Sequence, residues 1–202
     1  MNAPAPATVE PQLSPEAFLA RDRAAEARSE YYAGEVVAMA GASERHNLLV
    51  TNLVRLLGNQ LQGGPCRIYA SDMRVWNPAQ QSYTFPDVVV VCGERRFADE
   101  QRDVLLNPTL VVEVLSPSTE RKDRGKKAEG FRQLASLQEY LFVSQEAAHV
   151  ERYRRYSARQ WMLEETTQDD AIELAPAGCT LALQELYAGV FEEEEPGNPS
   201  GT

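Results

Sequence analysis

Three short and almost purely apolar runs constrain the fold of this chain most. They lie in Thr84–Cys92 (TFPDVVVVC), Leu110–Leu115 (LVVEVL) and Tyr140–Ser144 (YLFVS). Runs of four to eight apolar residues are typical of strands, and strands that lack polar alternation are covered on both faces. We therefore expect a central sheet with other elements packed against each side.

Signals for helices and outer strands surround these runs. Ser14 before Pro15 predicts a helix to about Ser29, Ser43 caps a helix to about Leu61, and Asp123 is expected to cap a helix over Arg124–Leu137. Further expected elements are a hairpin around Ala33-Gly34, strands over Cys66–Trp76, Val150–Tyr156, Trp161–Thr166 and Ala171–Ala175, and a last helix over Leu183–Val190. The fold class is α+β (α/β): a mixed central sheet flanked by helices, with an added outer β-meander.

Length and composition predict one domain. The 202 residues are 43% hydrophobic, which is enough for one core, and we place the domain at 13–190. The Ala/Pro-rich residues 1–12 and the acidic tail 191–202 are expected to be disordered. No apolar run approaches the roughly 20 residues of a membrane span, and no signal peptide is visible, so we expect no membrane partner.

Charge and cysteine content bear on partners and compartment. The net charge of −10 disfavours nucleic-acid binding by the whole surface, but basic residues cluster over 121–127 and 152–159. Cys66, Cys92 and Cys179 form no C-x-x-C pair and leave an odd thiol. We expect small buried cysteines in a reducing, cytoplasmic protein.

Glu113 is the first candidate for a catalytic or metal-binding residue. It stands inside the most apolar run of the chain, between Val112 and Val114. A buried carboxylate without a partner is very costly, so Glu113 must be protonated, paired or bound to a cation. A buried ion pair, or a side chain that reaches solvent at the sheet end, explains the residue equally well.

Asp87 strengthens the cation hypothesis. It follows Pro86 at the head of the neighbouring apolar run, 26 residues before Glu113. If the two strands pair, both carboxylates can project from one end of the sheet and offer oxygen ligands to Mg²⁺. Taken alone, Asp87 is an ordinary strand-entry residue.

Lys127 is the candidate cation of the site. It lies 14 residues after Glu113, near the start of the next expected helix, from which an ammonium could orient a water molecule or stabilise charge on a phosphate. The alternative is a solvated helix face, because Lys122, Arg124 and Lys126 are close by.

At this point the sequence resembles a known family. FPDVVVV, LVVEVLSPSTERKDRGKKAEGF, GEVVAMAGASERHN and VERYRRY together resemble the Uma-type restriction endonucleases of the PD-(D/E)XK nuclease superfamily, over about 30–190. The resemblance implies a restriction-endonuclease-like core and a Mg²⁺ site, which Mn²⁺ can also fill. Asp87 matches the Asp of the PD motif and Glu113 its second acid. The motif's lysine would stand at Leu115, and the resemblance assigns it to Lys127, with Lys126 as a competitor.

Two lesser candidates complete the predicted site. His46 matches a histidine that the family often carries, and it could accept a proton or contact phosphate, although a partly exposed helix-start histidine is an equal reading. Glu35, in the YYAGEVV hairpin, could be a further metal ligand or a plain turn residue.

The hypothesis is a metal-dependent endonuclease that hydrolyses phosphodiester bonds of DNA. Asp87, Glu113 and the carbonyl of Val114 would hold Mg²⁺, and Lys127 would assist the attacking water. A homodimer is expected to suit cleavage of both strands. The main alternative is a nuclease-fold binding or regulatory module that no longer cuts, which the acidic surface and the displaced lysine favour.

Overall fold

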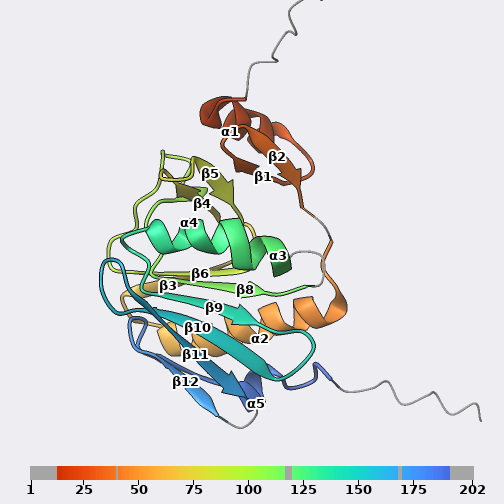
Figure 1. Cartoon of the computed structure of the whole chain (residues 1–202), viewed down its shortest axis with the longest axis vertical. Helices are drawn as coiled ribbons and strands as arrows, with labels where there is room; N and C mark the ends of the chain where they lie inside the picture. Colours follow the sequence, from red (N-terminus) through yellow and green to blue (C-terminus); the bar gives the residue numbers. More distant parts are fainter. Residues whose placement is uncertain (1–12, 40, 117–119, 168–169, 192–202) are drawn as a thin grey trace, which may run out of the picture.

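The computed structural model describes residues 13–39, 41–116, 120–167 and 170–191 (Figure 1). Of the segments expected to be disordered, 1–12 and 191–202, residues 1–12 and 192–202 lie outside the described residues. In chain order the elements are α1 (Pro15–Ala24), β1 (Ser29–Tyr32), β2 (Glu35–Ala38), α2 (Glu44–Leu61), β3 (Cys66–Ala70), β4 (Arg74–Asn77), β5 (Ser82–Thr84), β6 (Val88–Cys92), β7 (Val104–Leu105), β8 (Leu110–Val114), α3 (Glu120–Lys122), η1 (Asp123–Lys127), α4 (Ala128–Gln133), β9 (Glu139–Val143), β10 (His149–Arg155), β11 (Trp161–Thr167), β12 (Ala171–Leu174), β13 (Cys179–Ala182) and α5 (Leu183–Leu186).

A six-stranded mixed sheet forms the centre of the molecule. Its strand order is β11-β10-β9-β8-β6-β3, with β8 and β9 parallel and the other neighbours antiparallel. The three apolar runs supply β6, β8 and β9, which occupy adjacent central positions. The expected mixed sheet with an outer β-meander over β10 and β11 is confirmed.

Helices cover both faces of this sheet (Figure 1), because strands with apolar side chains on both faces need both of them buried. On one face α2 and α5 pack with β12 and β13 against Val88, Val90 and Val112. On the other face α4 packs against the residues that alternate with these, which include Val89, Val91 and Val111. The alternation of neighbouring side chains therefore decides which helix each strand residue meets.

A second sheet, of five strands, carries the N-terminal part of the chain. Its order is β2-β1-β5-β4-β7, and α1 packs on it through Phe18, which stacks on Tyr31. Two expected strands are therefore each divided between the sheets. The expected strand over Cys66–Trp76 is β3 and β4, separated by a bend where Ser71 has φ of 40°. Thr84–Cys92 is likewise divided at Pro86, between β5 and β6.

Three helix boundaries differ from expectation. Helix α1 ends at Ala24 rather than Ser29, because Asp22 accepts the Ser29 amide and turns the chain into β1. Helix α5 ends at Leu186 rather than Val190. The helix expected from Arg124 to Leu137 starts earlier, at Glu120, and its α-helical part ends at Gln133. Helix α2, by contrast, has the expected cap, since Ser43 Oγ accepts the His46 amide.

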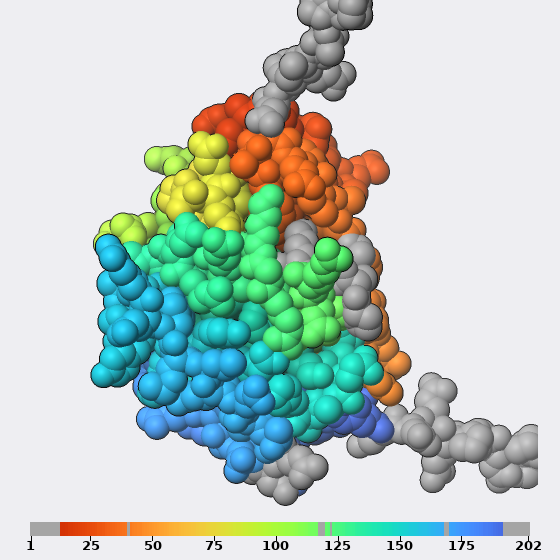
Figure 2. Space-filling view, in the orientation of Figure 1, coloured from red at the N-terminus to blue at the C-terminus, as the bar shows by residue number. Residues whose placement is uncertain are grey.

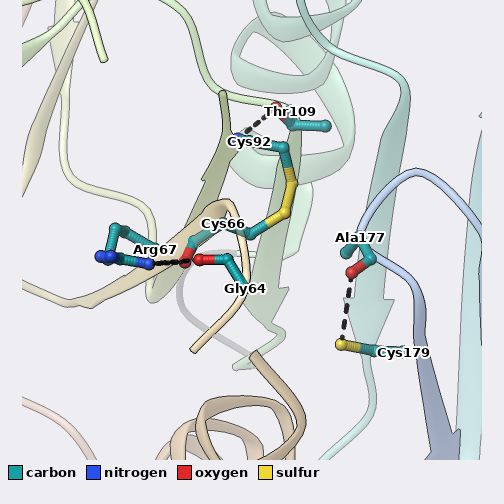
Figure 3. Close-up of a disulfide and its surroundings, with 7 residues drawn as sticks. All are labelled: Gly64, Cys66, Arg67, Cys92, Thr109, Ala177 and Cys179. Carbon is teal, nitrogen blue, oxygen red and sulfur yellow. Dashed lines mark hydrogen bonds between the residues drawn. A yellow bond between two sulfur atoms is a disulfide. The ribbon is translucent and has the colours of Figure 1, made fainter. Parts of the chain in front are cut away.

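The expectation of three separate thiols is wrong. Cys66 and Cys92 stand directly opposite each other in the β3–β6 ladder and form a disulfide (Figure 3). Cys179 is free and buried, with its Sγ near the Ala177 carbonyl. The 26-residue spacing concealed the pair because only the register of the two strands brings the cysteines together.

Candidate active site

Glu113 lies on the face of β8 that α4 and η1 cover. Its side chain alternates with Val112 and Val114, which face α2, so it points with Val111 and Leu115 into the opposite layer. It is 2% exposed, and its Oε1 lies 2.8 Å from Lys127 Nζ. Of the two alternatives for this residue, a side chain that reaches solvent is therefore wrong, and a buried ion pair is present.

Asp87 lies next to Glu113 on the neighbouring strand. The antiparallel register pairs Val88 with Val112, so one step further along the ladder brings Asp87 beside Glu113. Asp87 Oδ2 accepts the Val114 amide at 2.7 Å, which fixes the carboxylate across the end of the two strands. The structure thus brings together the two acids that the sequence analysis paired.

Lys127 is buried among carboxylates. Besides Glu113, its Nζ lies 3.3 Å from Glu30 Oε1 and 3.6 Å from Asp123 Oδ1, and it donates to the Phe85 carbonyl at 3.4 Å. Lys127 is 5% exposed, so the reading of a solvated helix face is wrong. Its placement beside Glu113 is as the sequence analysis expected.

The local backbone explains how Lys127 arrives there. The helix is kinked within η1 (Asp123–Lys127), where Gly125 has non-helical backbone angles. Asp123 and Lys127 are thereby turned toward one another and both are buried. The expected role of Asp123 as a helix cap is wrong: the helix has already begun at Glu120, whose amide donates to the Ser116 carbonyl.

Glu30 is a site residue that the sequence analysis missed. It is 4% exposed in β1, and its Oε1 accepts the Phe85 amide at 3.1 Å while Oε2 accepts the Tyr32 hydroxyl at 3.0 Å. The available signal was its position two residues before Tyr32, on the same face of a strand of the expected hairpin. A glutamate on an apolar strand face must, like Glu113, be protonated, paired or bound to a cation.

His46 and Glu35 have different surroundings. His46 Nε2 lies 3.2 Å from Asp87 Oδ1, so the start of α2 adds an imidazole to the acids. Its Nδ1 is buried and has no hydrogen-bond partner in the described part of the chain. Glu35 is exposed at the edge of the hairpin, 3.7 Å from Lys126, outside this buried group.

Burial and the neighbouring charges together raise the pKa of both Glu113 and Lys127. Burial, with Asp123 and Asp87 adding to it, raises the pKa of Glu113 well above its ordinary value, against the effect of Lys127. Burial lowers the pKa of Lys127, but Glu113, Glu30 and Asp123 outweigh it and raise that pKa well above the usual value. The carboxylates outnumber the cations, so the site attracts positive charge.

The donor set suits a magnesium ion held by few protein ligands. Among the described residues, no three His, Cys, Asp or Glu side chains converge closely enough to enclose a metal ion. Asp87 and Glu113 offer two carboxylates, and Val114, whose amide faces Asp87, directs its carbonyl to the same side of β8. Mg²⁺ is commonly bound through one or two carboxylates and keeps several waters, so this set fits it.

The carboxylates lie beneath a covering layer rather than in an open pocket. Figure 2 shows the green segment of α3, η1 and α4 between the orange N-terminal region and the cyan strands. A cavity of about 90 Å³ lies beyond the end of β8, where Leu115, Arg124 and Phe142 contribute to its wall, and neither Asp87 nor Glu113 lines it. Asp87, with 19% of its side chain exposed, is the more accessible acid.

The basic clusters are partly used within the molecule. Arg124 pairs with Glu120 and Glu151, and Arg152 pairs with Glu139 and Glu164. Arg155 donates to the Arg132 and Leu134 carbonyls at the end of α4 and stacks on Trp161. These arginines stabilise the fold and are not a ready nucleic-acid surface.

Other cations remain exposed beside the site. Lys126 lies over the Tyr32 ring and Arg28 over the Phe85 ring, and both are more than 40% exposed. Arg45, also exposed, precedes His46 at the start of α2. Each is adjacent in sequence or in contact with a residue of the site, so positive charge borders the acidic centre.

Comparisons with known proteins agree on one family. Residues 15–184 match the Uma2 family model, described as a putative restriction endonuclease. Two uncharacterized proteins of Synechocystis sp. are similar: sll1609 is 39% identical over 154 residues (76% of this chain, 87% of its own length), and slr1290 is 36% identical over 190 residues (94% and 99%).

A solved structure shares the fold. The crystal structure of a putative nuclease belonging to DUF820, from Anabaena variabilis, matches with a TM-score of 0.72 over 88% of this chain and 98% of that one. At 18% identity, this likeness establishes the fold. Separately, no helix in the described ranges has the length and apolar character needed to cross a membrane.

Proposed function

Because the chain belongs to the Uma2 family of putative restriction endonucleases, we propose that it is a metal-dependent endonuclease that hydrolyses phosphodiester bonds of DNA. One observation carries the proposal: Asp87 and Glu113 share one end of two paired strands, with the Lys127 ammonium 2.8 Å from Glu113. The excess of buried acids over cations there is costly for a protein that binds no ion.

In this proposal Asp87, Glu113 and the Val114 carbonyl hold Mg²⁺ or Mn²⁺. A divalent ion in such a site lowers the pKa of bound water and offsets charge on the phosphate. His46, through its contact with Asp87 Oδ1, orients the carboxylate that the ion needs. Glu35 stays a predicted outer ligand, one that would have to act through water.

Lys127 supplies a fixed positive charge beside Glu113. Its ammonium would orient the attacking water or stabilise negative charge as the phosphate reacts. The exposed Lys126, Arg28 and Arg45 would hold flanking phosphates, contacts that position DNA without reading its sequence. The net charge of −10 restricts such binding to this border of the site.

The test is cleavage of supercoiled plasmid and of single-stranded DNA with Mg²⁺ or Mn²⁺. Glu113→Ala is expected to abolish cleavage, Lys127→Ala to lower kcat about 100-fold or more, and Lys126→Ala chiefly to raise KM. Glu173→Ala, which changes an exposed acid on β12, is the control for a general effect of charge. Activity that survives both Glu113→Ala and Lys127→Ala would refute the mechanism.

A second candidate is a nuclease-fold module that binds or regulates without cutting. The near-complete burial of Lys127 favours it, because the same contacts would serve as a purely structural ion-pair network. Titration with Mn²⁺, followed by electron paramagnetic resonance, separates the two. The nuclease binds the ion in a manner lost in Asp87→Asn, whereas the inactive module does not bind it.

A homodimer is a further part of the proposal, since cleavage of both strands benefits from two sites. Sedimentation at micromolar concentration, with and without DNA, tests it. A monomer under both conditions would exclude the dimer and leave the single-site chemistry intact.

A further inference from the structure

Glu30 is the buried charge that the reaction scheme leaves unexplained. It comes from the N-terminal five-stranded sheet, whereas Glu113 and Asp87 belong to the six-stranded sheet and Lys127 to η1. Burying a carboxylate there is costly unless its oxygens are satisfied. Both are: Oε1 accepts the Phe85 amide and lies 3.3 Å from Lys127 Nζ, and Oε2 accepts the Tyr32 hydroxyl.

These contacts make Glu30 a rigid anchor. Phe85 donates its amide to Glu30 and accepts the Lys127 ammonium on its carbonyl, so a single residue, two before Asp87, is tied to both charges. The carboxylate is thereby held by one backbone amide, one tyrosine hydroxyl and the Lys127 ammonium. A charge held in this way needs no reorganisation when the charge distribution around it changes.

A metal ion bound to Glu113 would weaken the ion pair between Glu113 and Lys127. If the ion of the proposed function binds Glu113, it competes with the ammonium for the same carboxylate. Lys127 then depends on the remaining acids, Glu30 at 3.3 Å and Asp123 at 3.6 Å. Asp123 belongs to the same five-residue segment as Lys127, so Glu30 is the anchor from outside that segment.

We propose that Glu30 is the positioning residue for Lys127: it holds the ammonium in place beside Glu113, and acts on the reaction only through that lysine. This inference rests on the proposed function for its kinetic consequence. Its structural consequence, the immobilisation of Lys127, can be tested whether or not the protein cuts DNA.

The alternative is that Glu30 merely stabilises the fold. Asp22 offers a matched control, since it is a buried carboxylate paired with Arg74 at 2.6 Å, also against the five-stranded sheet, and it does not contact Lys127 in the described structure. Asp22→Asn therefore reports what the loss of a buried acid in this region does to stability alone. Its kcat is expected to match that of the wild-type protein at a temperature where both are folded.

The first experiment is acetylation of native, metal-free protein, with the modified lysines quantified by mass spectrometry. Glu30→Gln, which keeps the shape of the side chain, is expected to raise the rate of Lys127 modification severalfold relative to Lys126, and Asp22→Asn is not. Tyr32→Phe frees only Oε2 of Glu30 and should give a smaller rise; it replaces Glu30→Gln if that variant does not fold. Protection of Lys127 that is unchanged in Tyr32→Phe and in folded Glu30→Gln overturns the proposal.

The second experiment is a double-mutant cycle on cleavage. Glu30→Gln is expected to lower kcat about tenfold with KM unchanged, and Glu30→Gln with Lys127→Ala should be no slower than Lys127→Ala alone. Losses that multiply would show that Glu30 does not act through Lys127 and would refute the proposal. If the wild-type protein does not cleave DNA, the proposed function fails, while the acetylation result still decides the role of Glu30.

Discussion

Glu139 provides a pH-dependent test of how the central sheet is stabilised. It opens β9 with no exposed surface, its Oε1 lies 3.4 Å from Arg152, and its Oε2 has no hydrogen-bond partner in the described part of the chain. Burial raises the pKa of Glu139 to about 7, against the attraction of Arg152 and Arg154 and with the repulsion of Glu164 and Glu173. The perturbation that tests this is Glu139→Gln, which keeps the shape and removes the titration.

The direction of the effect follows from the two states. Unfolded, the carboxyl has a pKa near 4.5; folded, it has a pKa of about 7, so between these values the folded state holds a proton that the unfolded state has released. The free energy of unfolding therefore falls as the pH rises through this interval. At about 1.4 kcal/mol for each tenfold change in proton affinity, the full effect is about 3 kcal/mol, of which about 2 to 3 kcal/mol falls between pH 5 and pH 8.

The assay is urea unfolding at pH 5, 6, 7 and 8, followed by the fluorescence of Trp76 and Trp161. Since the variant cannot ionise, its stability relative to the wild-type protein should rise by about 2 to 3 kcal/mol across this range. Glu100→Gln, at an exposed acid between β6 and β7, should show no such trend. A difference between Glu139→Gln and wild type that is the same at every pH would refute the reasoning.

Three further predictions concern stability. Lys127→Ala removes the cation shared by Glu113, Glu30 and Asp123, and it should lower the free energy of unfolding by about 3 to 5 kcal/mol. Millimolar Mg²⁺ should restore part of this loss. An equal loss with and without Mg²⁺ would contradict the proposed ion site. Reduction of the Cys66–Cys92 disulfide should cost up to about 3 kcal/mol, and thiol counting by mass spectrometry on unfolded protein should give one thiol before reduction and three after it. Leu57→Ala, at a fully buried position of α2, should cost about 2 to 5 kcal/mol in urea unfolding, whereas Thr51→Ala at an exposed position of the same helix should cost less than about 1 kcal/mol.

Local sequence signals were sufficient for the central layers of the fold. The apolar runs around Val90, Val112 and Leu141 identified three buried strands, and Ser43 located the start of α2, because each of these features is decided by neighbours in the chain. The division of two expected strands between sheets was not predictable in this way. The local sequence around Ser71 does not indicate that the chain passes from one sheet to the other there.

The residues of the candidate site likewise differ in whether the sequence alone could identify them. Glu113 and Asp87 could be singled out because a charge in an apolar run is anomalous wherever the run folds. Asp123 could not, since its partner is Lys127, which only the tertiary structure brings to it, and Glu30 carried only the weaker signal of a glutamate two residues before Tyr32 on one strand. The Cys66–Cys92 pair was missed for the same reason, because it depends on a strand register that the spacing of the two cysteines does not encode.

The crossing of the chain between its two sheets has a consequence for how the protein can be shortened. Two of these crossings, from β3 to β4 and from β5 to β6, lie side by side, joined by the Ser71 amide on the Asp87 carbonyl at 2.8 Å, so Asp87 stands at the junction of the two sheets. The part of the chain before β3 contributes Glu30 and His46, and the part after β6 contributes Glu113 and Lys127. No fragment made by removing either part can retain the assembled centre, so the shortest version of this protein that keeps its chemistry must span both sheets.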